Sequence, residues 1–298
     1  MFYIFVVNGR NDMRERIDAD LRKQLEGRAI RYSIYHTEGP GDGLRYVRIH
    51  CDLYPAEEEC FIACGGSGTA NEVASGIVGY PSKSMAILAY GSSNDLIKYY
   101  PDRNFHSLDC ILRGENVKID IIKANENYSL NVINCGFDAM VAHEANRFLE
   151  QGKGQKGYVK AVWKCLLWHR FNHITVTADG ERLNRRTMVL CTLSNAGWCG
   201  GKYYCAPNAR TDDGLIDVCL FKSCTLLSFL LIMGKYTRGK HLSDPYCKKH
   251  LVYRQVRHAE LESKDLIFLG LDGEISAATH FDIDILPGAI NLVLPASD

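Results

Sequence analysis

The chain has 298 residues, which at about 150 residues per domain predicts two domains. Its 35 basic and 35 acidic residues cancel, which argues against a basic nucleic-acid-binding protein, and no nucleic-acid partner is expected. Apolar residues make up 46% of the chain, enough to offset the entropy of ordering it, which excludes a disordered chain. The most apolar stretch, Leu226–Met233, is too short to cross roughly 30 Å of membrane hydrocarbon.

The N-terminus predicts a strand and not a targeting segment. Met1–Val7 is rich in aromatic and β-branched residues, and it has no basic leader and no small-residue cleavage site. We therefore expect a cytoplasmic protein whose 12 cysteines are reduced thiols. Cys60 and Cys64 form the closest zinc-like pair, but no second pair follows them, which argues against a structural zinc site.

The first third of the chain alternates between strand and helix patterns. Met13–Gly27, for example, carries apolar residues at four-residue steps, which mark one face of a helix. In chain order the expected elements are Met1–Val7, Met13–Gly27, Ala29–Tyr35, Gly43–His50, Glu59–Cys64, Thr69–Val78 and Met85–Ala89. Strands and helices that alternate in this way predict a parallel sheet with helices on its faces.

From about Val117 the pattern changes to short strands with little helix. The expected strands are Val117–Ile122, Tyr128–Asn134, Ile174–Ala178, Thr187–Leu193, Leu215–Phe221, Glu260–Leu269 and His280–Leu286. The first two are expected to pair, Asp179-Gly180 is a hairpin turn signal, and Tyr158–Phe171 is expected to be a helix. This pattern of many short strands predicts an antiparallel sheet or sandwich.

These patterns predict an α/β fold followed by an all-β fold. We place the α/β domain at residues 1–116 and the all-β domain at residues 117–298. The alternative that the C-terminal end of the chain packs back on the first domain stays open.

A glycine-rich turn is the most informative segment of the chain. Cys64–Val73 reads CGGSGTANEV, and it follows an apolar strand and begins a helix. Glycines permit close approach of a ligand, and a helix N-terminus presents free N–H groups to an anion. The segment is neither a P-loop nor the dinucleotide fingerprint, because no Gly-Lys-Ser/Thr follows and Asn71 stands at the third glycine position. Taken alone, it is equally consistent with a tight strand-to-helix turn.

A second turn of the same kind follows the next strand. Tyr90–Leu96 reads YGSSNDL, and Asn94 or Asp95 could also act simply as a helix cap. Because the ends of successive parallel strands meet at one edge of the sheet, where α/β folds bind ligands, the two turns together predict a nucleotide site.

These motifs resemble those of the diacylglycerol kinase catalytic-domain family, which includes bacterial lipid kinases and sphingosine kinases. Gly65–Val73 matches the family's Gly-Gly-Asp-Gly-Thr loop and its Asn-Glu-Val, except at Ser67. Gly91–Asp95 resembles the family's Gly-Thr-x-Asn-Asp loop, with Ser92 in place of Thr. Further matches in family order are Asn8–Arg10, which is the weakest, and Thr37–Asp42, Asn131–Val141, Cys205–Asp217 and Leu271–Glu274.

The resemblance implies an N-terminal parallel-sheet nucleotide-binding domain, a C-terminal antiparallel β-sandwich that holds the lipid, and an active-site cleft between them. It also implies transfer of a phosphoryl group from ATP, with Mg²⁺, to a lipid alcohol such as diacylglycerol. The residues implied in nucleotide binding are Asn8, Thr37, Gly65, Gly66, Ser67, Gly68, Thr69, Asn71, Ser92 and Asn94.

The resemblance also assigns catalytic and metal residues. Glu274 is the implied base, and Asp95 and Asp120 match acidic positions that organise Mg²⁺ through water. A structural Mg²⁺ site would use the carboxylate of Asp213 and the main-chain carbonyls of Arg210 and Leu215. Turn, cap or exposed-strand roles are the structural alternatives for the four carboxylates.

Ser67 departs from the family pattern, because serine replaces an aspartate that contributes to the metal arrangement. A neutral hydroxyl can still form hydrogen bonds, but it cannot neutralise a metal ion. Two alternatives therefore stay open: a degenerate kinase that binds nucleotide or lipid without efficient catalysis, and a kinase of a soluble acceptor, as in NAD kinases.

A lipid kinase must also reach its acceptor at a membrane surface. The basic, aromatic-rich stretch 151–173 is a candidate for transient contact with the anionic inner face of the membrane. A helix packed on the sandwich with solvated lysines is the alternative. A second basic region, 235–257, is a solvated face or an oligomer contact, and a homodimer stays open.

Overall fold

The computed structural model describes residues 1–9, 11–91, 94–137, 139–141, 143–144, 164–165, 171–185 and 187–297. The chain forms two compact units. Unit 1 comprises Met1–Ile121 and Leu286–Asp298, and unit 2 comprises Ile122–Ile285. The chain passes from one unit to the other within two long strands, β5 (Glu115–Ala124) and β14 (Glu274–Leu294).

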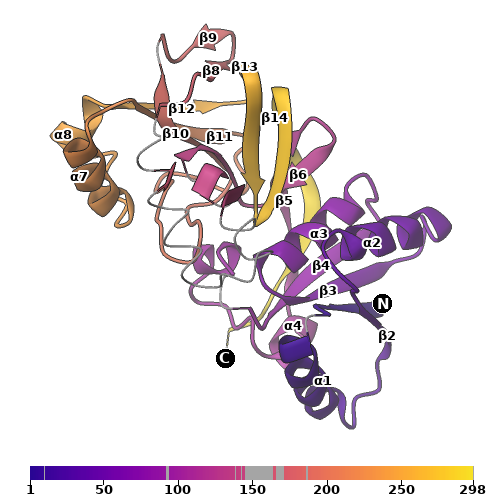
Figure 1. Cartoon of the computed structure of the whole chain (residues 1–298). Helices are drawn as coiled ribbons and strands as arrows, with labels where there is room; N and C mark the ends of the chain where they lie inside the picture. Colours follow the sequence, from indigo (N-terminus) through magenta and orange to yellow (C-terminus); the bar gives the residue numbers. More distant parts are fainter. Residues whose placement is uncertain are drawn as a thin grey trace. The chain divides into compact units, whose positions relative to one another are not determined.

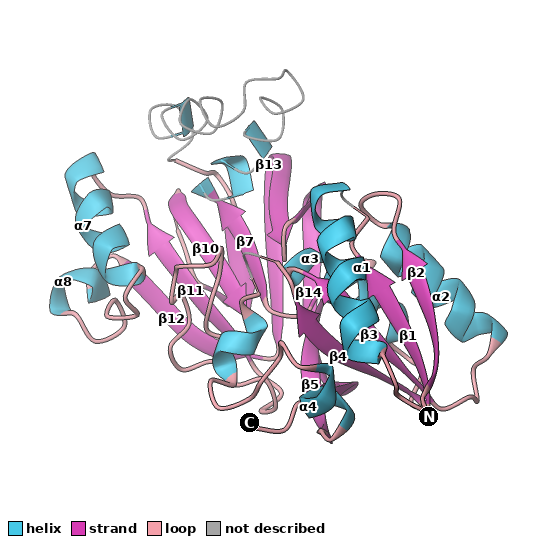
Figure 2. Ribbon diagram, turned by 90° about the horizontal axis from the view of Figure 1, so that it is seen from below, coloured by secondary structure: helices cyan, strands magenta, loops and turns pink. Residues whose placement is uncertain are grey.

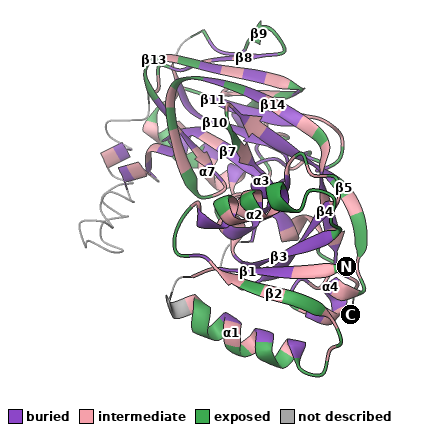
Figure 3. Ribbon diagram, turned by 90° about the vertical axis from the view of Figure 1, so that its right-hand side faces the viewer, coloured by how far each residue is buried: buried purple, intermediate pink, exposed green. Residues whose placement is uncertain are grey.

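Unit 1 is built on a parallel sheet, which confirms the α/β half of the expected fold. Its strands are β1 (Phe2–Val7), β2 (Arg31–His36), β3 (Glu59–Gly65) and β4 (Lys83–Ala89). They run in the order β2-β1-β3-β4, and the C-terminal part of β14 follows, where Leu292 pairs in parallel with Met85. β3 and β4 are buried along their whole length (Figure 3).

Helices cover both faces of this sheet. Figure 1 shows α1 (Asn11–Leu25) and α4 (Leu108–Leu112) on one side, and α2 (Asp42–Leu53) and α3 (Ser67–Ile77) on the other. A short 3₁₀ turn, η1 (Leu96–Tyr99), follows β4. The apolar side of α1, as expected from its four-residue spacing, packs into a buried cluster with alternate side chains of β1, β3 and β4.

Unit 2 is antiparallel, which confirms the second half of the expected fold. Its further strands are β6 (Asn127–Ser129), β7 (Val132–Gly136), β8 (Thr175–Ala178), β9 (Glu181–Arg182), β10 (Met188–Ser194), β11 (Ile216–Lys222), β12 (Leu251–Val256) and β13 (His258–Leu271). They pair in the order β12-β11-β10-β7-β13, and β13 also pairs with β8 and with the first part of β14. Asp179 and Gly180 both have positive φ and form the expected β8–β9 turn.

One expected strand pair is confirmed only in part. The range Tyr128–Asn134 is not a single partner of β5: its first residues belong to β6, which pairs with β5, whereas β7 pairs with β10 and β13. The chain breaks between these strands because the amides of Asn131 and Val132 donate hydrogen bonds to the carboxylate of Asp272.

Three elements of unit 2 are not predicted by the sequence patterns. They are α7 (Leu226–Tyr236), α8 (Pro245–Lys248) and β12. Thr225 accepts a hydrogen bond from the amide of Ser228 and begins α7, and Asp244 accepts bonds from two amides and begins α8. Figure 2 shows α7 and α8 beside β11 and β12. The helix expected at Tyr158–Phe171 falls almost entirely outside the described residues.

Candidate active site

The glycine-rich turn of unit 1 lies where β1, β2, β3 and β4 all end. Asn8 follows β1, Thr37 follows β2, Gly65–Thr69 leads from β3 into α3, and Gly91 follows β4. The strands are parallel, so these segments meet at one edge of the sheet, as the sequence predicts.

Glycine is required in this turn because two backbones touch. A Cβ atom on Gly91 would lie 2.4 Å from the Cα atom of Gly66, and one on Gly65 would lie 2.4 Å from the hydroxyl of Thr69. The amides of Tyr90 and Gly91 donate to the carbonyl of Gly65 at 3.1 and 3.0 Å. The two turns that the sequence singles out are therefore one packed structure.

Side chains that follow β1 and β2 link the segments beside this turn. Asn8 Nδ2 donates to Thr69 Oγ1 at 3.1 Å, and the amide of Gly9 donates to Thr37 Oγ1 at 3.0 Å. Thr37 and Thr69 are buried. Asn8 thus contacts the glycine-rich loop directly through Thr69, whereas Thr37 holds the segment that follows β1.

The first turn of α3 is suited to an anion. Gly66 is its N-cap and supplies no side chain to cap the free amides, and the first turn carries no acidic residue. Gly66, Ser67 and Gly68 are partly exposed, whereas Thr69 and Asn71 are buried. The amide groups of this turn and the positive end of the helix dipole therefore face an accessible position, which favours phosphate.

Ser67 and Asn94 link this turn to the loop that follows β4. Asn94 Nδ2 donates to the carbonyl of Gly65 at 3.1 Å, and Ser67 Oγ accepts from the amide of Asp95 at 3.2 Å. Asp95 is buried, and its carboxylate forms an ion pair with Lys98 at 2.7 Å. The structure therefore brings the expected metal residue Asp95 beside the position where the family carries its aspartate.

Glu72 has a role that the motif alone does not reveal. Its Oε1 accepts a hydrogen bond from the amide of Gly41 at 2.9 Å, and a Cβ atom on Gly43 would lie 2.3 Å from its Oε2. Glu72 thus ties α3 to the loop before α2. Its position after Thr69-Ala70-Asn71 is the only sequence signal for this contact.

Asp120 lies elsewhere in unit 1. It is 2% exposed, and its Oδ1 accepts a hydrogen bond from the amide of Gly288 at 2.7 Å. Asn291, three residues farther along β14, donates to the carbonyls of Pro81 and Lys83 at the start of β4. Asp120 is therefore near the amino-terminal end of β4, whereas the glycine turns follow the carboxyl ends. This placement favours a role in joining β5 to β14.

Glu274 is the exposed first residue of β14 in unit 2. It follows Asp272 and Gly273, which both have positive φ and form the β13–β14 turn. Asp272 anchors this turn, because its carboxylate accepts from the Ser129 hydroxyl and from the amides of Asn131 and Val132 at 2.9 to 3.1 Å. Burial raises the pKa of Asp272 to about 6. The sequence motif contains Asp272 but does not reveal that it holds Glu274 in place.

The expected structural metal site lies in a tight turn of unit 2. Asp213 Oδ1 accepts a hydrogen bond from the amide of Leu215 at 3.0 Å, and the Arg210 side chain contacts Asp212. The nearby carboxyl group of Asp217 is fully buried and accepts hydrogen bonds from Tyr253 and Gln255. Burial raises the pKa of Asp217 to about 6. This turn contains Arg210, Asp213 and Leu215, and metal binding there stays a prediction.

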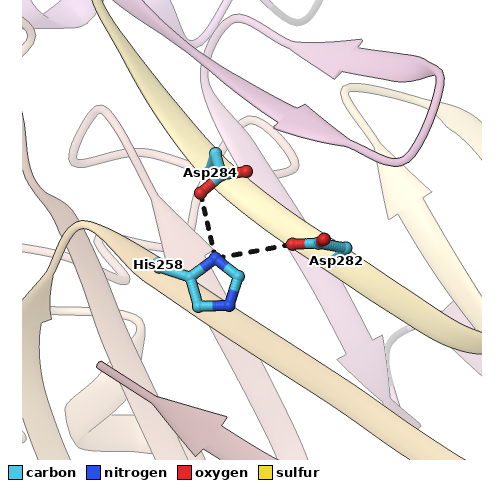
Figure 4. Close-up of side chains that lie close together, drawn as sticks. All are labelled: His258, Asp282 and Asp284. Atoms are coloured by element: carbon cyan, nitrogen blue, oxygen red, sulfur yellow. Dashed lines mark hydrogen bonds and ion pairs between the residues drawn. The ribbon is translucent and has the colours of Figure 1, made fainter. Parts of the chain in front are cut away.

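A histidine and two aspartates form a separate cluster in unit 2 (Figure 4). His258 Nδ1 lies 2.9 Å from Asp284 and 3.4 Å from Asp282, and its Nε2 lies 3.2 Å from Glu260. The hydrogen bonds to Asp284 and Glu260 raise the pKa of His258. The contacts of the imidazole with three carboxylates account for this cluster without a metal ion.

We expect His258 to stabilise the fold in a pH-dependent way. A raised native pKa means that its contribution is present below the unfolded imidazole pKa of about 6.5 and is lost as pH rises through the native value. The thermal midpoints of wild type and His258→Gln should therefore differ more near about pH 6 than near about pH 9. An equal difference at both pH values would show that the ion pairs contribute nothing.

Other predicted features lie outside the described residues, among them Ser92 and most of the basic stretch 151–173. In the part of the chain that is described, no helix is long and apolar enough to cross a membrane.

Comparison with known proteins agrees with the geometry of both units. The diacylglycerol kinase catalytic domain matches residues 3–124, and the YegS C-terminal NAD kinase beta sandwich-like domain matches residues 131–294. A protein of Shewanella frigidimarina named "Probable lipid kinase YegS-like" is 29% identical over 78% of this chain and 75% of its own length. A diacylglycerol kinase of Bacillus subtilis is 24% identical over 97% of this chain and 93% of its own.

The solved structures agree with this match at the level of the fold. A crystal structure of a diacylglycerol kinase from Bacillus anthracis superposes with a TM-score of 0.69 at 19% identity, and it covers 98% of this chain and 96% of that one.

Proposed function

Because the chain belongs to the diacylglycerol kinase catalytic-domain family and is a lipid kinase, we propose that ATP is its phosphoryl donor and diacylglycerol its acceptor. The observation that carries the choice of donor is the packed turn of unit 1. There Gly66 and Gly91 are in backbone contact, and the uncapped amides of α3 face an accessible position. Such a turn holds phosphate groups without side-chain charge.

In this proposal different residues bind the phosphates, position the loop and accept the proton during phosphoryl transfer. The amides of Gly66, Gly68 and Thr69 hold the phosphates of the nucleotide, Asn8 keeps the loop in place, and Thr37 holds the segment that contains Asn8. The acceptor oxygen forms a bond to the γ-phosphorus while the bond from that phosphorus to the bridging oxygen of ADP breaks. Glu274 takes the proton of the acceptor hydroxyl.

Mg²⁺ fits the donor set of this loop. Mg²⁺ takes oxygen ligands, keeps several waters and needs only one or two carboxylates in addition to phosphate oxygens. The hydroxyl of Ser67 accepts a hydrogen bond from the main-chain amide of Asp95, so the two residues are neighbours here. The carboxylate of Asp95 and the hydroxyl of Ser67 would hold the ion together with ATP. When bound, the ion neutralises charge on the phosphates. Asp120 is not part of this set because of its place near the start of β4.

Transfer of label from [γ-³²P]ATP tests this function. Lipid extracts and pure diacylglycerol would be offered in mixed micelles with and without Mg²⁺. We expect Mg²⁺-dependent labelling of a lipid that migrates with phosphatidic acid. Labelling of another lipid would show that this lipid, and not diacylglycerol, is the acceptor. ATP binding without any labelled lipid would favour a degenerate kinase, and labelling of a soluble acceptor alone would contradict a lipid acceptor.

Replacement of Ser67 by aspartate tests the metal assignment. The carboxylate of Ser67→Asp can still accept from the amide of Asp95, and it adds a negative charge beside Asp95. We expect the Mg²⁺ concentration for half-maximal rate to fall roughly tenfold or more, since such a charge attracts the ion by several kcal/mol at an effective dielectric constant of about 20. Ser67→Asn, which is similar in size but neutral, is the control. An equal Mg²⁺ response in both variants would place the ion elsewhere.

A further inference from the structure

Helix α7 of unit 2 exposes a row of leucine side chains. Leu227, Leu230 and Leu231 are 70%, 55% and 51% exposed. Their spacing places them on one side of the helix. Phe229 and Ile232 lie on the opposite side and are buried against the strands of unit 2. Because α7 is apolar on both sides, packing within unit 2 accounts for only one of them.

The leucine row lies in a strongly basic part of the chain. Residues 222–254 contain a single acidic residue, Asp244, which forms an ion pair with Lys235. The basic residues of this stretch are Lys222, Lys235, Arg238, Lys240, Lys248, Lys249 and Arg254. A row of exposed leucines in so basic a stretch of the chain suits a surface that is both apolar and anionic.

Arg238 places one of these charges at the end of the leucine row. Its Nε donates to the carbonyl of Gly234 at 2.8 Å. Gly234 is four residues after Leu230 and three after Leu231, so it continues the same side of the helix. Arg238 is exposed.

Helix α8 places further charges at the flank of α7. The hydroxyl of Tyr246 on α8 contacts the hydroxyl of Ser228 on α7 at 2.7 Å, and the Lys235–Asp244 ion pair holds the two helices together. Lys248 and Lys249, at the end of α8, are exposed. The leucine row and the lysines therefore belong to one folded structure.

We propose that the exposed sides of α7 and α8 dock on an anionic membrane surface. The three leucines enter the boundary between head groups and acyl chains, and Arg238, Lys248 and Lys249 pair with lipid phosphates. This proposal rests on the lipid-kinase function, because a diacylglycerol acceptor stays in the bilayer. A second copy of the chain would fit this surface less well, because in a two-fold dimer the basic surface of one copy would face the same basic surface of the other.

Vesicle cosedimentation without ATP tests the docking surface. The full chain would be mixed with phosphatidylcholine vesicles that contain, or lack, phosphatidylglycerol. We expect binding to the anionic vesicles that weakens with salt. A triple variant with Leu227→Gln, Leu230→Gln and Leu231→Gln should bind at least about tenfold more weakly. A Lys248→Gln, Lys249→Gln variant should lose about fivefold per lysine on anionic vesicles only.

Matched controls separate this proposal from its competitors. Leu53 and Leu266 are 67% and 59% exposed elsewhere, so Leu53→Gln with Leu266→Gln should bind like wild type. If the triple variant bound vesicles as tightly as wild type, the proposal would be overturned. It would also be overturned if wild type were a dimer and the triple variant a monomer. If wild type binds vesicles through α7 but labels no lipid, the proposed function is contradicted and the docking surface is still supported.

Discussion

Glu274→Gln should lower kcat for lipid phosphorylation by about 10²–10⁴-fold, the range in which a positioned general base contributes. The amide keeps the size of the side chain but cannot take the proton of the acceptor hydroxyl. Glu274 is exposed and Asp272 makes the anchoring hydrogen bonds of the turn, so the thermal midpoint should stay within error of wild type. Initial rates in mixed micelles and the thermal midpoint would be measured on the same preparation.

Glu262→Gln is the matched control for this variant. Glu262 is also an exposed glutamate in the β13–β14 ladder, where it pairs with His280, and the proposed mechanism gives it no role. Its rate should equal that of wild type. Equal rates for Glu274→Gln and wild type would remove Glu274 from the mechanism. A large loss in both variants would show that the ladder, and not the base, is sensitive to charge.

The order of the elements from β1 to β4 follows from local signals. β1, β3 and β4 are short apolar runs, and α1 and α2 carry apolar residues on one side, so the parallel sheet can be predicted from neighbours in the sequence. The meeting of Gly66 and Gly91 follows in turn, because the carboxyl ends of adjacent parallel strands share one edge.

Other features depend on contacts that no local pattern records. Asp120 accepts its hydrogen bond from Gly288, which is 168 residues away in the chain, so its position depends on the return of β14 to unit 1. The helix at Leu226–Tyr236 has no helical periodicity to detect, because it is apolar on its buried and its exposed side alike. Asp272 is visible as part of a motif, but its anchoring role depends on the distant segment 129–132.

Gly91→Ala should disable the nucleotide turn of unit 1. The new methyl group would lie 2.4 Å from the Cα atom of Gly66 and 2.9 Å from its amide nitrogen, and backbone atoms cannot rotate away as a side chain can. The turn must therefore move. Because misplacement by about 1 Å can cost about 10²-fold in rate, we expect a loss of that size, with ATP affinity reduced as well. Overpacking should also lower the free energy of unfolding by about 1–3 kcal/mol.

Gly39→Ala separates this steric effect from the general effect of replacing a glycine. A Cβ atom on Gly39 would meet nothing within 4 Å, and Gly39 does not have a positive φ. This control should keep the rate and the ATP affinity of wild type, and reduced entropy of the unfolded chain should leave it equally or slightly more stable. Equilibrium ATP binding and urea unfolding distinguish the two substitutions. If Gly91→Ala binds ATP as tightly as Gly39→Ala does, the contact between the turns does not position the phosphates, and the nucleotide site must be sought elsewhere in unit 1.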